Sequence, residues 1–202
     1  MTKIKICGIM REQDCECLNE LLPDCAGFIF AKSSRRYITP ETAARFREIL
    51  DKRIKTVGVF LNEDIEEVCR IAKSGIIDIV QLHGAETDDY VNEVKARTGL
   101  TVFKAFTIKG IADVNTALHS AADILLLDNG CGTGEQFDHE LIDEVDRMYY
   151  LAGGLDPDNV AAAVDRYCPY GVDVSTGVET DGQKDPERIK KFIEQVRSLN
   201  NF

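Results

Sequence analysis

The chain has 202 residues, with 24 Lys and Arg against 35 Asp and Glu, a formal net charge of −11 at pH 7 and a pI of about 4.8. This balance excludes the basic surface that nucleic-acid binding needs, so we expect no nucleic-acid partner. No run approaches the roughly 18 consecutive apolar residues of a membrane span, and the N-terminus lacks the pattern of a signal peptide. We therefore expect a cytoplasmic protein without a membrane partner.

The cysteine pattern indicates reduced thiols. Seven cysteines are scattered along the chain, an odd number that does not suit a disulfide framework in the absence of a signal peptide. No two of them form a C-x-x-C pair, so we expect no zinc site, no other metal and no cofactor.

Short apolar runs recur along the whole chain and alternate with segments of helical spacing. We expect strands at residues 3–7, 25–30, 56–61, 76–82, 101–107, 123–128, 149–153 and 171–175. Each run is almost continuously apolar, which is typical of strands in a parallel sheet that is buried on both faces.

The segments between the strands show the start signals of helices. A helix is expected at residues 11–22, and four others begin near a residue that can cap a helix, followed in three cases by proline. These candidate cap residues are Thr39, Asn62, Asp156 and Asp185.

The eight strands and up to eight helices follow one another without a Pro/Gly/Ser-rich linker. We therefore expect a single domain over residues 1–202, an α/β fold of the closed (β/α)8 TIM-barrel type in a small variant with short loops. A doubly wound open sheet is the alternative, and it would need fewer units and a reversal of strand order.

In such a barrel the carboxyl ends of all strands share one face, and catalytic groups lie there. Polar or conformationally special residues occur at or just after most of the expected strand ends: Cys7, Arg36, Gln81, His83, Asp128, Gly153, Gly154, Ser175, Thr176 and Gly177. The pattern predicts one cup lined by these residues.

The loops after the seventh and eighth strands, "LAGGLDPDNV" and "VDVSTGVE", suit a phosphate. Glycines such as Gly153 and Gly154 let backbone N–H groups approach an anion, and Ser175 and Thr176 add hydroxyls. Two ordinary tight turns are the simpler interpretation. Neither "GCGTGEQ" nor "GVETDGQK" predicts a nucleotide site, because Glu135 and Gln183 stand where Gly and Lys are required.

Four side chains each allow a structural and a functional interpretation. Cys7 is either core filler or a working thiol at a strand tip. Asp128 either caps a turn or donates a proton in catalysis. Arg36 either lies in a solvated basic loop or clamps a carboxylate with two parallel hydrogen bonds. His83 is either a hydrogen-bonded structural residue or a lining residue of the pocket.

Taken in order, "KICGI", "GFIF…SSRRYITP", "VGVF", "VQLHG", "LLLDN…GTG…FD", "AGGLDPDNV" and "VDVSTGVE…GQKD" closely resemble the phosphoribosylanthranilate isomerase family of tryptophan biosynthesis. The resemblance runs from residue 3 to about residue 186. Two departures are small: Thr176 replaces a frequent serine and keeps the hydroxyl, and His139 replaces a frequent tryptophan.

The resemblance implies an Amadori rearrangement without a cofactor, from N-(5-phosphoribosyl)anthranilate to 1-(2-carboxyphenylamino)-1-deoxyribulose 5-phosphate. It assigns the general base to Cys7, the general acid to Asp128 and the anthranilate carboxylate to Arg36. The other residues expected to bind this phosphosugar are His83, Gly153, Gly154, Asp173, Ser175, Thr176 and Gly177. We expect a monomer, since no unusual apolar face stands out on the helices.

Three other functions fit parts of the pattern. A lyase that closes the indole ring would need a catalytic lysine, for which Lys104 is available, and a pair of glutamates. A flavin-binding barrel oxidoreductase would use the phosphate loops alone. A non-catalytic phosphosugar sensor would bind its ligand without turnover.

Overall fold

The computed structural model describes residues 1–128 and 145–199. Eight parallel strands close into a barrel in chain order, with β8 paired to β1. The strands are β1 (Lys3–Cys7), β2 (Cys25–Ile29), β3 (Lys55–Phe60), β4 (Ile79–Leu82), β5 (Thr101–Thr107), β6 (Ile124–Asp128), β7 (Tyr149–Ala152) and β8 (Gly171–Val174). The predicted (β/α)8 barrel is confirmed, and the doubly wound alternative is wrong because the strand order never reverses.

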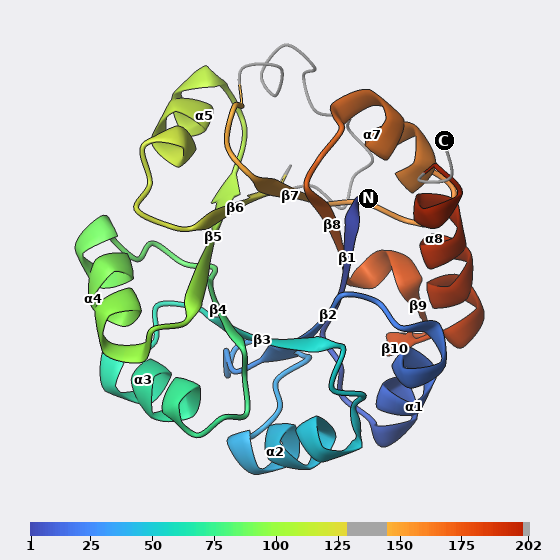
Figure 1. The fold of residues 1–202 in the computed structure, drawn as a ribbon, viewed down its shortest axis with the longest axis horizontal. Coiled ribbons are helices and arrows are strands. Elements are labelled where there is room, and N and C mark those ends of the chain that lie inside the picture. The colour runs from blue at the N-terminus through green and yellow to red at the C-terminus, as the bar shows by residue number, and fades with distance from the viewer. Residues whose placement is uncertain (129–144, 200–202) are drawn as a thin grey trace.

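The helices form a ring around the strands, as Figure 1 shows in a view along the barrel. They are α1 (Glu12–Leu21), α2 (Pro40–Ile49), α3 (Ile65–Lys73), α4 (Asp88–Thr98), α5 (Ile111–Leu118), α7 (Val160–Tyr167) and α8 (Pro186–Ser198). Glu135, His139 and the "GTG" and "FD" segments of the resemblance lie outside the described residues. None of the described helices is both long and apolar enough to cross a membrane.

Two of the predicted helix caps are confirmed. The Thr39 hydroxyl accepts a hydrogen bond from the backbone N–H of Thr42 at 3.2 Å. The Asp185 carboxylate accepts from the N–H groups of Glu187 and Arg188 at 3.0 and 3.3 Å. These bonds satisfy backbone donors that have no partner within the helix.

Helices α3 and α7 begin after the predicted cap residues, at Asp64 and Asn159. Helix α3 is capped by Asp64, whose carboxylate accepts from the N–H of Glu66 at 2.8 Å. Asn62 instead has a φ of +49°, a left-handed conformation that asparagine tolerates in turns. Before α7, Asp156 closes a turn by accepting from the N–H groups of Asp158 and Asn159 at 2.8 and 3.0 Å.

The region between Val174 and α8 contains structure that the sequence did not predict. A short 3₁₀ helix, η1 (Thr176–Val178), leads into a two-stranded antiparallel hairpin of β9 (Glu179–Thr180) and β10 (Gln183–Lys184). Gly182 turns this hairpin with a φ of +77°, which glycine adopts without steric cost.

The barrel interior changes from apolar to polar toward the carboxyl ends of the strands. Its apolar part consists of Phe103, Ala105, Ile124, Leu126, Tyr150 and Ala152. Inward-facing positions recur every second residue, so on β6 the series Ile124, Leu126 and Asp128 leads from this cluster to a carboxylate. The larger apolar core packs between the barrel and the helices.

Replacing Asp185, the cap residue of α8, tests how much this cap stabilises the protein. We expect Asp185→Ala to lower the free energy of unfolding by about 1 kcal/mol, because two backbone N–H groups lose their acceptor. Urea unfolding measures the change. Asp158→Ala, which removes an exposed partner of Lys191, should change stability by less than about 0.5 kcal/mol, and equal losses in both variants would contradict a capping role.

Candidate active site

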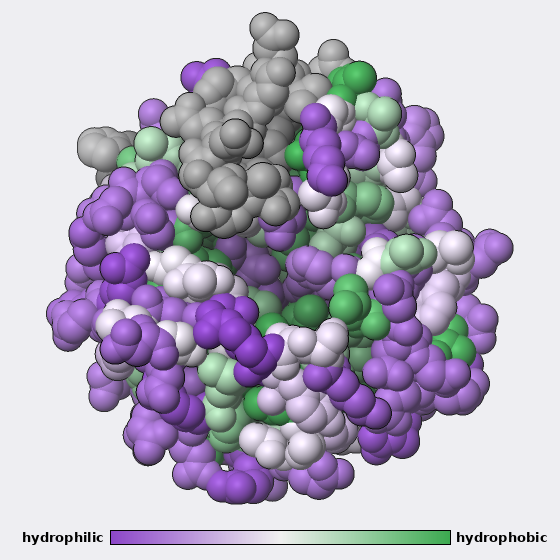
Figure 2. All heavy atoms as spheres, turned by 180° about the vertical axis from the view of Figure 1, so that it is seen from behind, coloured by the Kyte–Doolittle hydropathy of each residue, from purple (hydrophilic) through white to green (hydrophobic). Residues whose placement is uncertain are grey.

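A cavity of about 720 Å³ opens at the carboxyl ends of the strands. Figure 2, a view from the side opposite to Figure 1, shows a hollow in the middle of the molecule with polar and apolar residues in its walls. All ten site residues expected from the sequence line this cavity, namely Cys7, Arg36, His83, Asp128, Gly153, Gly154, Asp173, Ser175, Thr176 and Gly177. The fold therefore brings together residues that are spread over 171 positions of the chain.

Cys7 ends β1 and is 6% exposed. Lys5, two residues earlier on the same face of the strand, is 0% exposed, and its Nζ donates to Asp173 Oδ1 at 2.9 Å. A Cβ atom on Gly27 of the neighbouring strand would lie 2.8 Å from Cys7 Sγ and 3.2 Å from Lys5 Nζ. The thiol and the ammonium therefore converge on a space that only glycine leaves open.

Charges around Cys7 act in opposite directions. Burial raises the pKa of the Cys7 thiol above its usual value, and the positive charge of Lys5 offsets only part of this rise. Burial disfavours the charged form of Lys5, but the Asp173 carboxylate and Cys7 hold the pKa of Lys5 above its usual value. Lys5 is thus a permanent cation whose field favours the Cys7 thiolate. Sequence reasoning missed Lys5, although the two-residue period of a strand already places it on the same face as Cys7.

The loops after β7 and β8 meet at the cavity. Gly153 and Gly154 have consecutive positive φ values of 84° and 65°, and successive residues of unusual backbone conformation can aim several N–H groups at an anion. A Cβ on Gly177 would overlap the Leu155 carbonyl. Close contact between the two loops thus depends on glycine at this position.

The two hydroxyls expected near a phosphate have partners within the chain. Ser175 Oγ donates to the Cys7 carbonyl at 3.1 Å. Thr176 Oγ1 accepts from Arg36 Nη2 at 3.0 Å. The Ser175 hydrogen is therefore engaged, whereas the Thr176 hydroxyl keeps its own hydrogen, so a phosphate at these loops would depend on backbone N–H groups and at most this one hydroxyl.

Arg36 follows β2 and reaches over the end of β1, where a Cβ on Gly8 would overlap the arginine side chain. The Arg36 guanidinium donates from Nε and Nη2 to the two carboxylate oxygens of Glu179, at 2.6 and 3.0 Å. Arg36 is therefore not a solvated loop residue. Its guanidinium already makes the two parallel hydrogen bonds to a carboxylate that suit its geometry.

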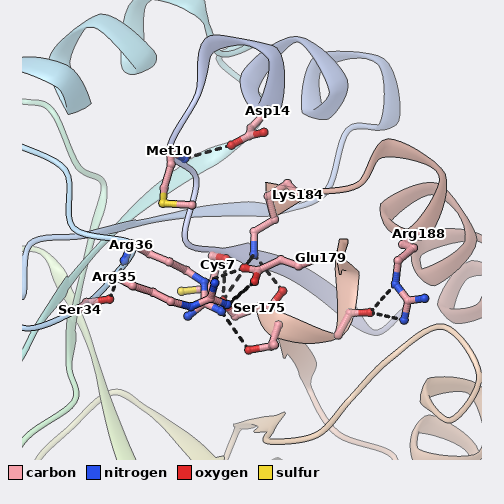
Figure 3. Close-up of polar contacts among 12 residues, drawn as sticks. Cys7, Met10, Asp14, Ser34, Arg35, Arg36, Ser175, Glu179, Lys184 and Arg188 are labelled. Atoms are coloured by element: carbon pink, nitrogen blue, oxygen red, sulfur yellow. Dashed lines mark hydrogen bonds and ion pairs between the residues drawn. The ribbon is translucent and has the colours of Figure 1, made fainter. Parts of the chain in front are cut away.

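Glu179 was not among the predicted site residues. Its side chain is 3% exposed and also contacts Arg35 at 2.5 Å and Lys184 at 2.8 Å. Figure 3 shows these three cationic side chains converging on Glu179, close to Cys7 and Ser175. Burial raises the pKa of Glu179, but hydrogen bonds from Arg36 and Lys184 outweigh it and bring the pKa to about 2. Glu179 is therefore ionised at neutral pH.

His83 lies in the cavity wall beside Gln81. Gln81 Nε2 and His83 Nδ1 are 3.1 Å apart, and Gln81 Oε1 is buried without a hydrogen-bond partner among the described residues. Burial lowers the pKa of His83 and outweighs the opposing influence of Asp128. The imidazole is therefore favoured in its neutral form. Gln81 is therefore a further cavity residue with an acceptor available to a ligand.

Lys104, the lysine considered for a ring-closing lyase, is held away from the main cavity. Its Nζ donates to the Gly84 carbonyl at 2.6 Å and to Glu86 at 3.1 Å. It lines a second cavity of about 320 Å³, which shares His83 and Asp128 with the first. Among the residues that the structure describes, no three His, Cys, Asp or Glu side chains are grouped to hold a metal ion.

Comparison with known proteins identifies relatives over nearly the whole chain. The family model described as N-(5'phosphoribosyl)anthranilate (PRA) isomerase matches residues 4–195. N-(5'-phosphoribosyl)anthranilate isomerases from Thermoanaerobacter sp. (strain X514) and Clostridium acetobutylicum are each 43% identical, over 98% of this chain and 100% of theirs.

Solved structures give the same result. Phosphoribosyl anthranilate isomerase from Thermotoga maritima has a TM-score of 0.90 at 37% identity, covering 98% of this chain and 100% of that chain. A phosphoribosyl anthranilate isomerase in complex with reduced 1-(o-carboxyphenylamino)-1-deoxyribulose 5-phosphate has a TM-score of 0.87 at 36% identity, with the same coverage.

The ionisation of Glu179 predicts an acid-dependent loss of stability. Because the pKa of about 2 in the folded state lies below the ordinary value of about 4.3, the unfolded chain binds this proton first as pH falls. The stabilisation is thus complete above about pH 5 and is lost toward pH 2. Between pH 5 and pH 2, wild type should lose about 2–3 kcal/mol more unfolding free energy than Glu179→Gln, as measured by urea titration at each pH. Parallel pH profiles would contradict this.

The contact between the two glycine loops predicts a steric effect. Gly177→Ala forces a methyl group against the Leu155 carbonyl and should destabilise the fold by about 1–3 kcal/mol. Thermal and urea unfolding measure this loss. Gly110→Ser is the control, because a Cβ there meets nothing within 4 Å and serine suits the start of α5; equal losses would refute the steric explanation.

Proposed function

The chain belongs to the N-(5'-phosphoribosyl)anthranilate isomerase family, the isomerases of tryptophan biosynthesis, and we propose that it performs their reaction as an Amadori rearrangement with Cys7 as general base and Asp128 as general acid. The single observation that carries the proposal is the convergence of all ten expected residues on one cavity of about 720 Å³. The substrate is N-(5-phosphoribosyl)anthranilate and the product is 1-(2-carboxyphenylamino)-1-deoxyribulose 5-phosphate.

Two anionic groups fix the substrate across the cavity. The backbone at Gly153–Gly154 and at residues 175–177 binds the 5-phosphate, and Arg36 binds the carboxylate of the aromatic ring. The close approach of Gly177 to the Leu155 carbonyl, which leaves no room for a side chain, supports this arrangement. It shows that the two proposed phosphate-binding loops are in contact. Holding both ends leaves the sugar carbons C1 and C2 between Cys7 and Asp128.

The first step opens the ribose ring. The Asp128 carboxyl donates a proton to the ring oxygen while the bond from C1 to that oxygen breaks. The lone pair of the anilino nitrogen forms a double bond to C1 and gives a protonated Schiff base. His83, neutral beside Asp128, adds no positive charge that would oppose this cation.

The second step moves a proton from C2. The Cys7 thiolate takes it, the C–H electrons form the C1–C2 double bond, and the nitrogen regains its lone pair. The resulting enolamine tautomerises: the C2 hydroxyl becomes a ketone and C1 gains a proton. No outside oxidant is needed, because C1 is reduced as C2 is oxidised. Lys5 supports the step by favouring the thiolate.

Kinetics of three variants test the proposal. We expect wild type to consume phosphoribosylanthranilate that is generated in situ, followed by its fluorescence. Cys7→Ser and Asp128→Asn should each reduce kcat by about 10²- to 10⁴-fold, the usual contribution of one general acid or base. Cys168→Ser, at an exposed cysteine outside the cavity, should retain full turnover.

The outcomes distinguish a wrong role for Cys7 from a wrong activity. Turnover that survives Cys7→Ser would return this thiol to a packing role and leave the isomerase activity intact. A folded wild type that binds the phosphosugar without turnover would contradict the proposed activity and favour a sensor.

A further inference from the structure

The guanidinium of Arg36 is oriented by a carboxylate of the chain. Glu179 takes the edge of Arg36 formed by Nε and Nη2, with bonds of 2.6 and 3.0 Å. The second hydrogen of Nη2 points to Thr176 Oγ1 at 3.0 Å. The outer edge of Arg36, at Nη1, can still receive a second carboxylate, since the two Nη1 hydrogens take no part in these contacts and the guanidinium has five donors in a fixed planar fork.

Thr176 lies where that second carboxylate would meet Arg36. Because its hydroxyl oxygen accepts from Nη2, its own hydrogen is left to donate to a neighbouring acceptor. A ligand carboxylate at this edge would thus bind Nη1 of Arg36 and the hydroxyl of Thr176. Both Thr176 and Arg36 line the main cavity, in which the substrate is proposed to bind.

Glu179 is itself held by groups from other elements. Lys184, whose side chain is 1% exposed, donates to Glu179 at 2.8 Å and to the Ser175 carbonyl at 2.8 Å. The β9–β10 hairpin that carries both residues is tied to α1, since Arg11 Nη2 donates to the Lys184 carbonyl at 2.7 Å. Figure 3 shows Lys184 and Arg36 approaching Glu179 from different sides.

The charges of this cluster favour an anion. Glu179 contributes one negative charge, and its partners Arg35, Arg36 and Lys184 contribute three positive charges. The group as a whole is cationic within a protein of net charge −11. Glu179 therefore orients Arg36 without cancelling the attraction for a second carboxylate.

We propose that Glu179 is a positioning residue, which fixes Arg36 so that its outer edge recognises the carboxylate on the substrate's aromatic ring. The inference rests on the proposed function and adds to it the origin of the enzyme's selectivity for a carboxylated arylamine. Without Glu179, the long Arg36 side chain is free to rotate and must be ordered by the ligand, which weakens binding.

Two stable ligands separate this role from a merely structural one. The first is reduced 1-(o-carboxyphenylamino)-1-deoxyribulose 5-phosphate, and the second is the same compound without the carboxyl group. Calorimetry gives both dissociation constants for wild type, Glu179→Gln, Glu179→Asp and Glu86→Gln. The measured quantity is the ratio of the two constants, because loss of the fold or of the phosphate site weakens both ligands alike.

Wild type should prefer the carboxylated ligand by about tenfold to a hundredfold, the range of hydrogen bonds to charged groups. Glu179→Gln should lose most of this preference and leave binding of the carboxyl-free ligand within about twofold. Glu179→Asp, which keeps the charge on a shorter stem, should retain part of it. Glu86→Gln, which breaks a buried ion pair with Lys104, should leave the ratio unchanged.

Three results would overturn the inference: an unchanged ratio in Glu179→Gln, equal weakening of both ligands, or a higher ratio, which would mean that Glu179 competes with the ligand for Arg36. If Glu179→Gln does not fold, the double variant Glu179→Gln/Lys184→Met removes both charges of the Glu179–Lys184 ion pair. It should show the same loss of preference for the carboxylated ligand. An unchanged ratio would again refute the positioning role of Glu179.

Failure of the proposed function looks different. Wild type would then bind neither phosphosugar, or would bind both equally and show no turnover.

Discussion

One buried ion pair bridges the seam where the barrel closes, between its first and last strands. Lys5 of β1 and Asp173 of β8 are register partners across this seam, and their side chains meet at 2.9 Å with 0% and 9% exposure. Such a pair adds little net stability, but loss of one partner leaves an unpaired buried charge, which is strongly destabilising. The pair therefore fixes the register of β1 against β8, and the same register places Cys7 at the rim of the cavity.

A second buried carboxylate organises the loops above this seam. Glu179 connects the segment after β2, which carries Arg35 and Arg36, with Lys184 on the hairpin before α8. Arg188 of α8 adds a further link by donating to the Gly177 carbonyl at 2.9 Å. Loops are normally the most mobile parts of a barrel, and these contacts hold them against each other where the substrate would bind.

Several cations are buried at the site although the protein as a whole is acidic. The chain carries a net −11, yet Lys5, Arg36 and Lys184 are all buried or nearly so around the cavity, at 0%, 13% and 1% side-chain exposure. Poorly hydrated cations interact strongly with an anionic ligand because the surrounding dielectric is low. Asp173 and Glu179 offset part of this positive charge, and Arg36 remains the group suited to a carboxylate of the ligand.

The sequence by itself determined the barrel and the position of each expected site residue along it. Continuous apolar runs mark strands buried on both faces, and polar residues such as Cys7 and Asp128 at their ends meet because parallel strands share a carboxyl edge. Only the tertiary structure decided the electrostatics. Lys5 and Asp173 are 168 positions apart and Arg36 and Glu179 are 143 apart, so no local pattern pairs them. The cap of α3 at Asp64 and the β9–β10 hairpin likewise depend on side-chain bonds and turns that hydrophobic periodicity does not encode.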